Sequence, residues 1–326
     1  MDKPLNNVPK YGLAMLLFAT LACRLMTFGS PPVVATQAVE TTAPSRSMAV
    51  SPTPNIKPTV TSAVASTPLA ASHEKIDHQG VTMILIPGGE FEMGFNPSAL
   101  YDYERANFLF EARPQYRPAH QVTVSQFYLD QYEVSNEQYR SCVFANACKV
   151  PEMNGIRGIK DYYNKSEYKN YPVVGVTWEM AKSFCEWRGS RLPTEAEWER
   201  AAKGENNSAY PWNGNSQNCR IANYLNCANH PVAVDSFPEG VNSYGIYNLA
   251  GNVAEWTSSL FLPYPYNASD GREDMTIQGE RSVRGGSWDS HGGNADIYTF
   301  ARYGYYAMKN NYNDYTGFRC AKSLEP

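Results

Sequence analysis

The feature that most constrains the fold of this chain is the uneven distribution of its large side chains. All six tryptophans and nearly all of the 23 tyrosines lie between residues 80 and 323. Residues 24–72 consist mainly of Pro, Ser, Thr, Ala and Val, with too few large apolar groups to offset the entropy lost on folding. We therefore expect a disordered tether over residues 24–78. Residues 79–326 should form one domain, since a core of roughly 240 residues is stable by itself.

The N-terminus has the pattern of an export signal. Two lysines precede an apolar run over Tyr11–Ala22, whose 12 residues are too few to span a bilayer comfortably. The run ends in Leu-Ala-Cys23, which is similar to a bacterial lipoprotein processing site, although Thr20 replaces the usual aliphatic residue. We therefore expect residues 1–23 to direct export, and Cys23 to carry a lipid that holds the domain at a membrane outside the cytoplasm. Ordinary cleavage after a small residue, or a retained anchor, is the alternative.

The cysteine count agrees with export. Seven cysteines are an odd number for an exported chain, so one of them needs a separate role. If Cys23 carries a lipid, six remain for disulfides, which form in oxidising compartments. Two pairs are close in sequence, and the last two cysteines would then join distant parts of the domain. The expected pairs are Cys142 with Cys148, Cys219 with Cys227, and Cys185 with Cys320.

The charge of the chain argues against nucleic acid as a partner. The formal net charge is −4, and no cluster of lysine and arginine stands out. Binding a phosphate backbone requires such a cluster of cations. We therefore expect no nucleic-acid partner.

Few segments of the domain have a long hydrophobic period, so loops should dominate it. Residues 83–94 read as two short strands around a Pro-Gly-Gly turn, and residues 120–130 alternate as a strand does. Capping-box sequences predict helices that begin at Ser135 and at Thr194, the second ending before Gly204. A further helix should run from Thr177 to Gly189. The pattern predicts an irregular, loop-rich α+β domain held together by disulfides.

Seven separated motifs occur in order along this domain. They are Pro87-Gly-Gly-Glu-Phe-Glu-Met-Gly, Glu133-Val-Ser-Asn-Glu-Gln-Tyr, Pro172-Val-Val-Gly-Val-Thr-Trp, Arg191-Leu-Pro-Thr-Glu-Ala-Glu-Trp-Glu, Tyr247-Asn-Leu-Ala-Gly-Asn-Val-Ala-Glu-Trp, Arg284-Gly-Gly-Ser-Trp and Gly317-Phe-Arg-Cys. Together they resemble the formylglycine-generating enzyme (sulfatase-modifying factor) domain over about residues 80–323. The resemblance implies a C-type-lectin-like variant fold with little regular structure.

The resemblance also implies a chemistry that this chain lacks the residues to perform. Enzymes of the family oxidise a sulfatase cysteine to formylglycine with molecular oxygen and copper(I), which two thiolates hold. The matching positions here are Ser290 and Ala295, or Asn294 if the loop is one residue shorter, and the family's structural disulfide matches Cys185 and Cys320. A hydroxyl and a methyl group cannot replace two thiolates, so we expect neither copper nor catalytic residues.

Histidine-based iron chemistry is also disfavoured. Iron-dependent relatives use histidines from an added helical domain, which this chain lacks. The five histidines here are scattered along the sequence: His73, His78, His120, His230 and His291.

Calcium is the metal that the resemblance favours. The implied ligands are the Asn248 side chain, the carbonyls of Gly251 and Val253, and the Glu255 carboxylate, an oxygen set suited to a hard cation. The alternative is a Gly-Asn turn that leads into a strand whose Trp256 is core. A second family site begins at positions that match Asn223 and Tyr224, but its later Asp-containing loop is shortened here.

Residues 287–316 have the composition of a binding loop. They include six tyrosines and four asparagines, in which rigid rings supply contact area and small polar groups supply adaptable hydrogen bonds. Variable proteins of diversity-generating elements, which share this fold, display ligand-binding residues from the same stretch. We therefore expect a binding groove formed by Ser287, Trp288, Ser290, His291, Tyr298 and Arg302. Packing of the tyrosines in a loop-rich core is the alternative.

Two functions from different classes follow. The first is a non-catalytic, calcium-stabilised binding or envelope-associated module, whose C-terminal groove holds a protein, peptide or glycan ligand. The second is an oxidoreductase of the formylglycine-generating type, or an enzyme of related chemistry. The missing cysteine pair favours the first.

Overall fold

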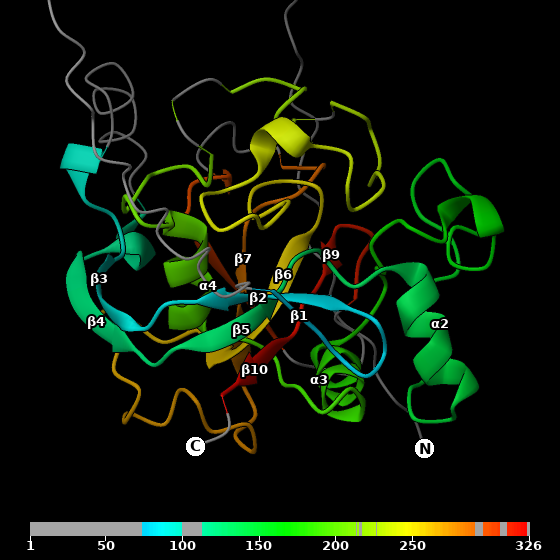
Figure 1. The fold of residues 1–326 in the computed structure, drawn as a ribbon, viewed down its shortest axis with the longest axis horizontal. Coiled ribbons are helices and arrows are strands. Elements are labelled where there is room, and N and C mark those ends of the chain that lie inside the picture. Colours follow the sequence, from blue (N-terminus) through cyan, green and yellow to red (C-terminus); the bar gives the residue numbers. More distant parts are fainter. Residues whose placement is uncertain are drawn as a thin grey trace, which may run out of the picture. The chain divides into compact units, whose positions relative to one another are not determined.

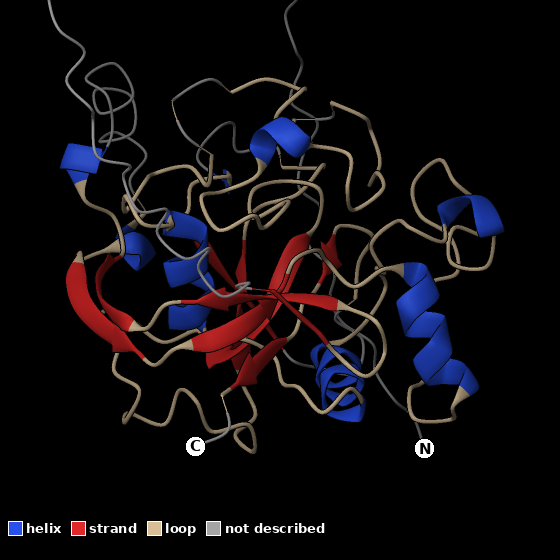
Figure 2. Ribbon diagram, in the orientation of Figure 1, coloured by secondary structure: helices blue, strands red, loops and turns tan. Residues whose placement is uncertain are grey.

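The computed structural model describes residues 74–99, 113–212, 214, 217–225, 227–290, 296–306 and 312–324. The predicted leader, Cys23 and residues 24–73 of the predicted tether lie outside these ranges. Residues 74–78 were also predicted to belong to the tether, and this is corrected: Glu74–Ile76 form a strand that pairs with Thr82–Ile86, and Asp77 contacts Arg188. The folded domain therefore includes these residues. Short helices and strands are joined by long loops (Figure 2), which confirms an irregular α+β fold. No helix within the described ranges is long and apolar enough to cross a membrane.

Three sheets form the framework of the domain (Figure 1). The first has the order β1-β2-β5-β10, with all neighbours antiparallel: β1 (Glu74–Ile76), β2 (Thr82–Ile86), β5 (Phe127–Asp130) and β10 (Ala321–Ser323). The second has the order β8-β7-β6-β9: β6 (Ala254–Leu260), β7 (Glu280–Arg284), β8 (Arg302–Tyr306) and β9 (Thr316–Gly317). The third pairs β3 (Gly89–Met93) with β4 (His120–Val124).

The predicted strand over residues 120–130 is divided into β4 and β5, which belong to different sheets. The division lies where Gly88 packs against the backbone at Gln126. A Cβ atom at Gly88 would lie 2.7 Å from the Gln126 amide nitrogen, and real Cβ atoms do not approach backbone so closely. Both chain segments therefore bend at this point, a feature that alternation of residues does not reveal.

Three α-helices begin where the capping sequences predict: α2 (Asn136–Phe144), α3 (Trp178–Trp187) and α4 (Glu195–Lys203). Their N-caps are Ser135, Thr177 and Thr194, and the first and last form complete capping boxes. The end of α4 at Gly204 is confirmed too, since this residue has a φ of 63°. The described residues also form four separate 3₁₀ helices: Pro97–Ala99, Pro114–Tyr116, Ser166–Tyr168 and Pro238–Gly240.

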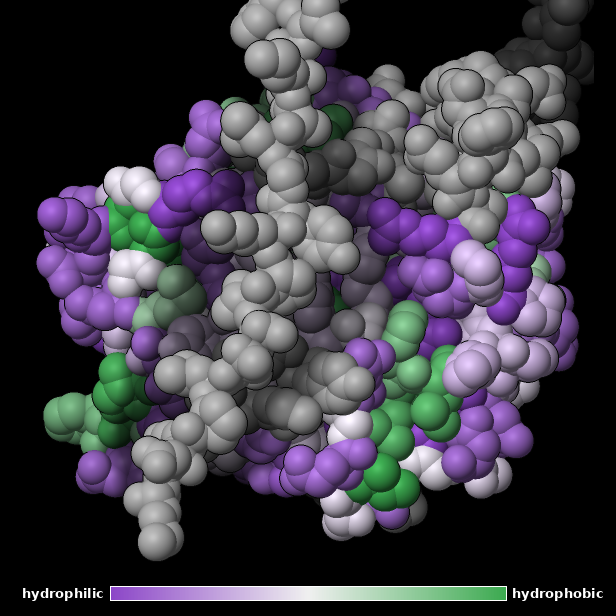
Figure 3. Space-filling view, turned by 180° about the vertical axis from the view of Figure 1, so that it is seen from behind, coloured by the Kyte–Doolittle hydropathy of each residue, from purple (hydrophilic) through white to green (hydrophobic). Residues whose placement is uncertain are grey.

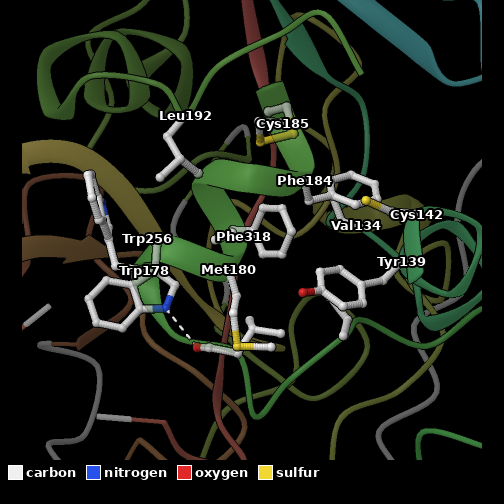
Figure 4. Close-up of a cluster of buried hydrophobic side chains, with 14 of the residues drawn as sticks. Val134, Tyr139, Cys142, Trp178, Met180, Phe184, Cys185, Leu192, Trp256 and Phe318 are labelled. Carbon is white, nitrogen blue, oxygen red and sulfur yellow. Dashed lines mark hydrogen bonds between the residues drawn. A yellow bond between two sulfur atoms is a disulfide. The ribbon is translucent and has the colours of Figure 1, made fainter. Parts of the chain in front are cut away.

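All three predicted disulfides are present: Cys142–Cys148, Cys185–Cys320 and Cys219–Cys227. The second joins α3 to the segment before β10 and lies within a buried cluster with Phe184, Phe318 and Trp256 (Figure 4). In the same cluster, Trp178 donates a hydrogen bond to the carbonyl of Thr257 at 2.8 Å. Helix, strand and C-terminal segment are thus joined in one core.

Buried ion pairs join elements that lie far apart in the sequence. Arg188 makes contacts of 2.7 Å with both Asp77 and Asp130, and its side chain is fully buried. Arg284 is paired with Glu195 and Glu199 of α4 in the same way. Removing one partner from such a pair leaves an uncompensated buried charge.

The surface outside this framework is mixed. Where Figure 3 shows described residues, on the face opposite to that of Figure 1, hydrophilic residues predominate and apolar residues form separate patches. The large hydrophobic residues that remain exposed are Ile76, Phe144, Val150, Leu225, Met275, Ile277 and Leu324.

Candidate functional site

A cavity of about 320 Å³ opens beside β6, β7 and β8. Its size falls in the range of small-ligand sites. The apolar lining comes from Ala254 and Val283, on adjacent strands of the β6–β9 sheet, and polar and aromatic groups form the rest. The lining residues are Arg113, Ala254, Val283, Gly286, Ser287, Asp289, Ser290, Asp296, Tyr303, Tyr305 and Tyr315.

One side of the cavity is a tight turn after β7. Gly286 has a φ of 65°, and a Cβ atom there would lie 2.6 Å from the carbonyl oxygen of Asp296. The turn closes on itself, because the Ser287 amide donates to Ser290 Oγ at 2.8 Å and the Ser290 amide donates to the Ser287 carbonyl at 3.0 Å. The Ser290 hydroxyl is therefore a fixed acceptor whose own proton remains available for a ligand.

No thiol lies at this turn. The position predicted to match the first catalytic cysteine is Ser290, and all six cysteines in the described ranges are in disulfides. Ala295 and His291 lie outside the described residues. Soft sulfur donors for copper(I) are therefore missing from the described wall.

A salt bridge forms the rim beside this turn. Arg157 donates to both oxygens of Asp289, at 2.7 and 2.8 Å, and its guanidinium lies 5.0 Å from the centre of the Trp288 ring. The backbone amide of Arg157 also donates to Asp314 at 3.0 Å. Because the Arg157 side chain is 58% exposed, this rim faces solvent.

Tyrosines form the opposite wall. The Tyr303 hydroxyl donates to Asp296. The Tyr116 hydroxyl lies 3.4 Å from the Tyr303 hydroxyl. Burial raises the pKa of Tyr303 and of Tyr305 well above the usual range for tyrosine. Both hydroxyls therefore stay protonated at neutral pH and present neutral, amphipathic groups to the cavity.

Three residues of the predicted groove are instead part of the core. Trp288, Tyr298 and Arg302 are only 1, 3 and 0% exposed. Tyr298 stacks on Phe300 with ring centroids 4.8 Å apart, and Arg302 is paired with Glu195 at 2.6 Å. This is a correction: for these three residues the core alternative holds, since composition does not show which side chains face outward.

Several residues that line the cavity or its rim could not be recognised from the sequence. Five of them lie within the stretch 287–316: Asp289, Asp296, Tyr303, Tyr305 and Tyr315. The sequence shows the type of each side chain there, but not whether that side chain faces the cavity. Arg113 and Arg157 belong to loops without any motif. Ala254 and Val283 come together only through the pairing of β6 with β7.

The segment predicted to bind calcium forms a buried, curved nest. Asn248, Gly251 and Asn252 have φ values of 55°, 80° and 58°, so the chain repeatedly adopts the left-handed conformation. Among the described residues, none donates a hydrogen bond to the carbonyls of Gly251 and Val253. Both residues are buried, and buried carbonyls normally have partners. These two oxygens therefore fit a cation.

Only some of the side-chain oxygens of the nest are available to a cation. Glu255 Oε2 accepts hydrogen bonds from Trp198 and Arg319, both at 2.8 Å, whereas Oε1 accepts one from Arg319 at 2.7 Å. Each carboxylate oxygen has two lone pairs, so only Oε1 keeps one for a metal. The Asn248 amide nitrogen donates to Glu133 and to the Val234 carbonyl, which leaves Asn248 Oδ1 as the free end. The donor set is one carboxylate, one amide and two carbonyl oxygens, which suits calcium.

Glu133 is a second carboxylate beside this nest. Burial raises its pKa to about 8, an effect that Arg319 and the hydrogen bonds from Asn248 and Asn252 reduce and that Glu255 increases. Glu133 is therefore mostly protonated at neutral pH, and a cation beside it would favour its ionised form.

The oxygens of the predicted second set accept hydrogen bonds from their own loop. Asn223 Oδ1 accepts from the Ala228 amide at 3.2 Å, and the Tyr224 carbonyl accepts from the Cys227 amide at 2.9 Å. Each oxygen keeps one lone pair, as Glu255 Oε1 does, within the loop that Cys219–Cys227 closes. The described residues contain no group of three or more His, Cys, Asp and Glu side chains that could hold a metal ion.

His120 and His230 are structural in the described part of the chain. His120 Nε2 accepts from the Tyr266 amide at 2.7 Å, and Nδ1 lies 2.8 Å from the Pro118 carbonyl, so Nδ1 carries the proton. His230 Nδ1 lies 2.7 Å from the Pro231 carbonyl. His78 is on the surface and His73 lies outside the described residues.

The model of the sulfatase-modifying factor enzyme 1-like domain matches residues 69–324. The chain belongs to this family. The Arg284-Gly-Gly-Ser-Trp motif contributes Gly286 and Ser287 to the lining of the cavity described above.

Relatives of the chain include proteins with different names. It is 33% identical over 261 residues to serine/threonine-protein kinase pkn1 of Chlamydia pneumoniae, covering 74% of this chain but only 38% of that protein. It is 30% identical over 291 residues to inactive C-alpha-formylglycine-generating enzyme 2 of Bos taurus, and the match covers 74% of this chain and 88% of that protein. It is 30% identical over 301 residues to formylglycine-generating enzyme of Mus musculus, covering 75% and 76%.

A solved structure supports the fold of the sulfatase-modifying factor domain. PvdO from Pseudomonas aeruginosa superposes with a TM-score of 0.59 at 24% identity, covering 77% of this chain and 97% of that one. At this identity, the likeness concerns the fold alone.

Proposed function

We propose that this sulfatase-modifying factor domain is a non-catalytic, calcium-stabilised binding module that acts outside the cytoplasm. Its ligand, a protein, peptide or glycan, would occupy the cavity lined by Ser287, Ser290 and the three tyrosines. One observation carries the proposal: the hydroxyl of Ser290, the residue predicted to match the first catalytic cysteine, is held in a closed turn.

The chemistry of the cavity supports binding over redox work. Hydroxyls are hard, neutral donors, and copper(I) is a soft ion that requires thiolates. The tyrosine hydroxyls stay protonated and therefore offer no strong base. Apolar strand residues, aromatic rings and a few polar groups are the composition of a small-ligand pocket.

The proposal includes a bound calcium ion in the 248–255 nest. The side chains of Asn248 and Glu255 and the carbonyls of Gly251 and Val253 would hold it. When bound, calcium would favour the ionised form of Glu133 and would fix the curved segment. This role is structural, because the nest supplies no reacting group.

Location outside the cytoplasm and membrane attachment through Cys23 are also part of the proposal. Three disulfides within one domain support it, since such bonds persist in oxidising compartments and are rare in reducing ones. We propose no nucleic-acid partner, because the chain carries a net charge of −4.

The second candidate is an oxidoreductase of the formylglycine-generating type. The observation that favours it is the 30% identity to formylglycine-generating enzyme of Mus musculus over most of the domain. Such a reaction would require a thiol at the cavity, and the described cysteines are all in disulfides.

One experiment separates the two. The purified full chain is incubated with a sulfatase-type cysteine peptide, copper and oxygen, and the peptide is analysed by mass spectrometry. We expect the peptide to be unchanged. Formylglycine above the level of a protein-free control would refute the non-catalytic proposal.

Binding is tested separately on peptide and glycan arrays. Ser290→Trp should abolish any captured signal by filling the cavity, and Lys182→Trp on the exposed face of α3 is the matched control.

A further inference from the structure

A buried carboxylate outside the family's metal-ligand pattern contacts the calcium nest. Glu133 lies just before the N-cap of α2, and it is 1% exposed. One oxygen accepts from Asn248 Nδ2 at 2.7 Å, and the other accepts from Asn252 Nδ2 at 3.0 Å. The backbone amide of Val253 approaches the same carboxylate at 3.4 Å. Glu133 is thus linked to three positions in the curved segment.

These contacts decide which end of the Asn248 amide is free. Asn248 Nδ2 donates to two oxygens, one of the Glu133 carboxyl group at 2.7 Å and the Val234 carbonyl at 2.8 Å. Turning the amide over would place Oδ1 against both of these oxygens. The observed orientation therefore leaves Oδ1, the atom that binds a cation, directed away from Glu133.

Asn252 is fixed in the same manner and connects the nest to a second loop. Its Nδ2 donates to Glu133, and its Oδ1 accepts from the Val232 amide at 2.9 Å. The Asn252 amide nitrogen of the backbone donates to the Asn223 carbonyl at 2.8 Å. Glu133 therefore holds Asn248 and also Asn252 of the Gly251–Val253 turn, and with Asn252 the direction of the carbonyls of that turn.

We propose that Glu133 is the positioning residue of the calcium site: it touches no ion itself, but orients Asn248 and the turn that supplies the carbonyl ligands. This inference rests on the calcium part of the proposed function. Groups that orient metal ligands typically change affinity by about 10- to 100-fold when they are removed.

Glu133→Gln is the informative change. Glutamine has nearly the same shape but only one acceptor oxygen, whereas two asparagine amides and one backbone amide face this position. One donor must therefore meet the glutamine NH₂ group, and the simplest relief is to turn over the Asn248 amide. The expected result is calcium binding weaker by about 10- to 100-fold. Glu133→Asp keeps two acceptor oxygens on a shorter chain and should lose less.

The control is a half-buried carboxylate, that of Glu273. Glu273 accepts hydrogen bonds from Ser258, Ser259 and Tyr266, and hydroxyls can rotate to accommodate an amide. Glu273→Gln should therefore cost stability without altering calcium affinity by more than about twofold. The change matches Glu133→Gln in charge and shape.

Calcium affinity is measured by titration calorimetry on the full chain after chelator treatment, and Tm is recorded in chelator and in calcium. Weak binding by Glu133→Gln with near-normal binding by Glu273→Gln supports the inference. Equal affinities for wild type and Glu133→Gln overturn it while leaving the calcium proposal intact. No binding by wild type overturns the calcium proposal itself. If Glu133→Gln is unfolded in chelator, Glu133→Asp is decisive, and wild-type affinity there contradicts the inference.

Discussion

Replacing Cys185 and Cys320 together by alanine should cost more stability than removing either other disulfide. The two residues are 135 positions apart, whereas the other bridges close loops of 6 and 8. The loop-entropy model gives about 5 kcal/mol for the long loop and about 2 kcal/mol for each short one. Domains are typically stable by about 5–15 kcal/mol. The long bridge is therefore a large share of the total.

The burial of both cysteines adds to this expectation. Cys185 and Cys320 are 0% exposed and pack against Phe184 and Phe318, so alanine also leaves small voids. The assay is guanidinium unfolding followed by tryptophan fluorescence, with near- and far-UV dichroism as a check for a single transition. Cys142→Ala with Cys148→Ala is the matched control. A long-bridge variant that loses no more free energy of unfolding than this control would refute the loop-entropy reasoning.

Three further predictions concern charged groups. Arg188→Met should lower the free energy of unfolding by about 3–5 kcal/mol, because it leaves Asp77 and Asp130 buried without their cation; a loss below about 1 kcal/mol in urea unfolding contradicts this. Arg157→Ala should change stability by less than about 1 kcal/mol in the same assay, since its salt bridge is on the surface. Burial lowers the pKa of His120, against the opposing effects of Pro118 and Glu199, so its neutral form is favoured in the folded state. Stability should therefore fall as the pH drops below about 6.5, the pKa of an unfolded histidine, and His120→Gln should reduce that slope.

Local signals in the sequence predicted the elements that depend on local chemistry. The caps at Ser135, Thr177 and Thr194 satisfy amide groups within one turn, so they could be recognised from a few residues. The disulfides followed from counting and spacing. Both kinds of feature leave a mark within the chain that does not depend on the final packing.

The parts that could not be predicted depend on contacts between distant segments. Whether Tyr298 or Tyr303 faces the cavity is decided by the stack on Phe300 and by the pairing of β8 with β7. Arg302 appeared suited to a groove, but Glu195 lies 107 positions away in sequence and holds it in the core. Glu133 carried a family motif, yet its link to Asn248 spans 115 positions. Composition alone contains none of this information.

The most direct test of the central claim is the affinity of the intact protein for copper(I). The oxidised full chain is titrated without oxygen against a chromophoric copper(I) chelator, with Ser290→Ala as the matched variant. We expect the ion to stay with the chelator for both wild type and variant, because hydroxyls and disulfide sulfurs do not replace thiolates. Tight binding of one copper(I) ion per chain by wild type, lost in Ser290→Ala, would contradict it.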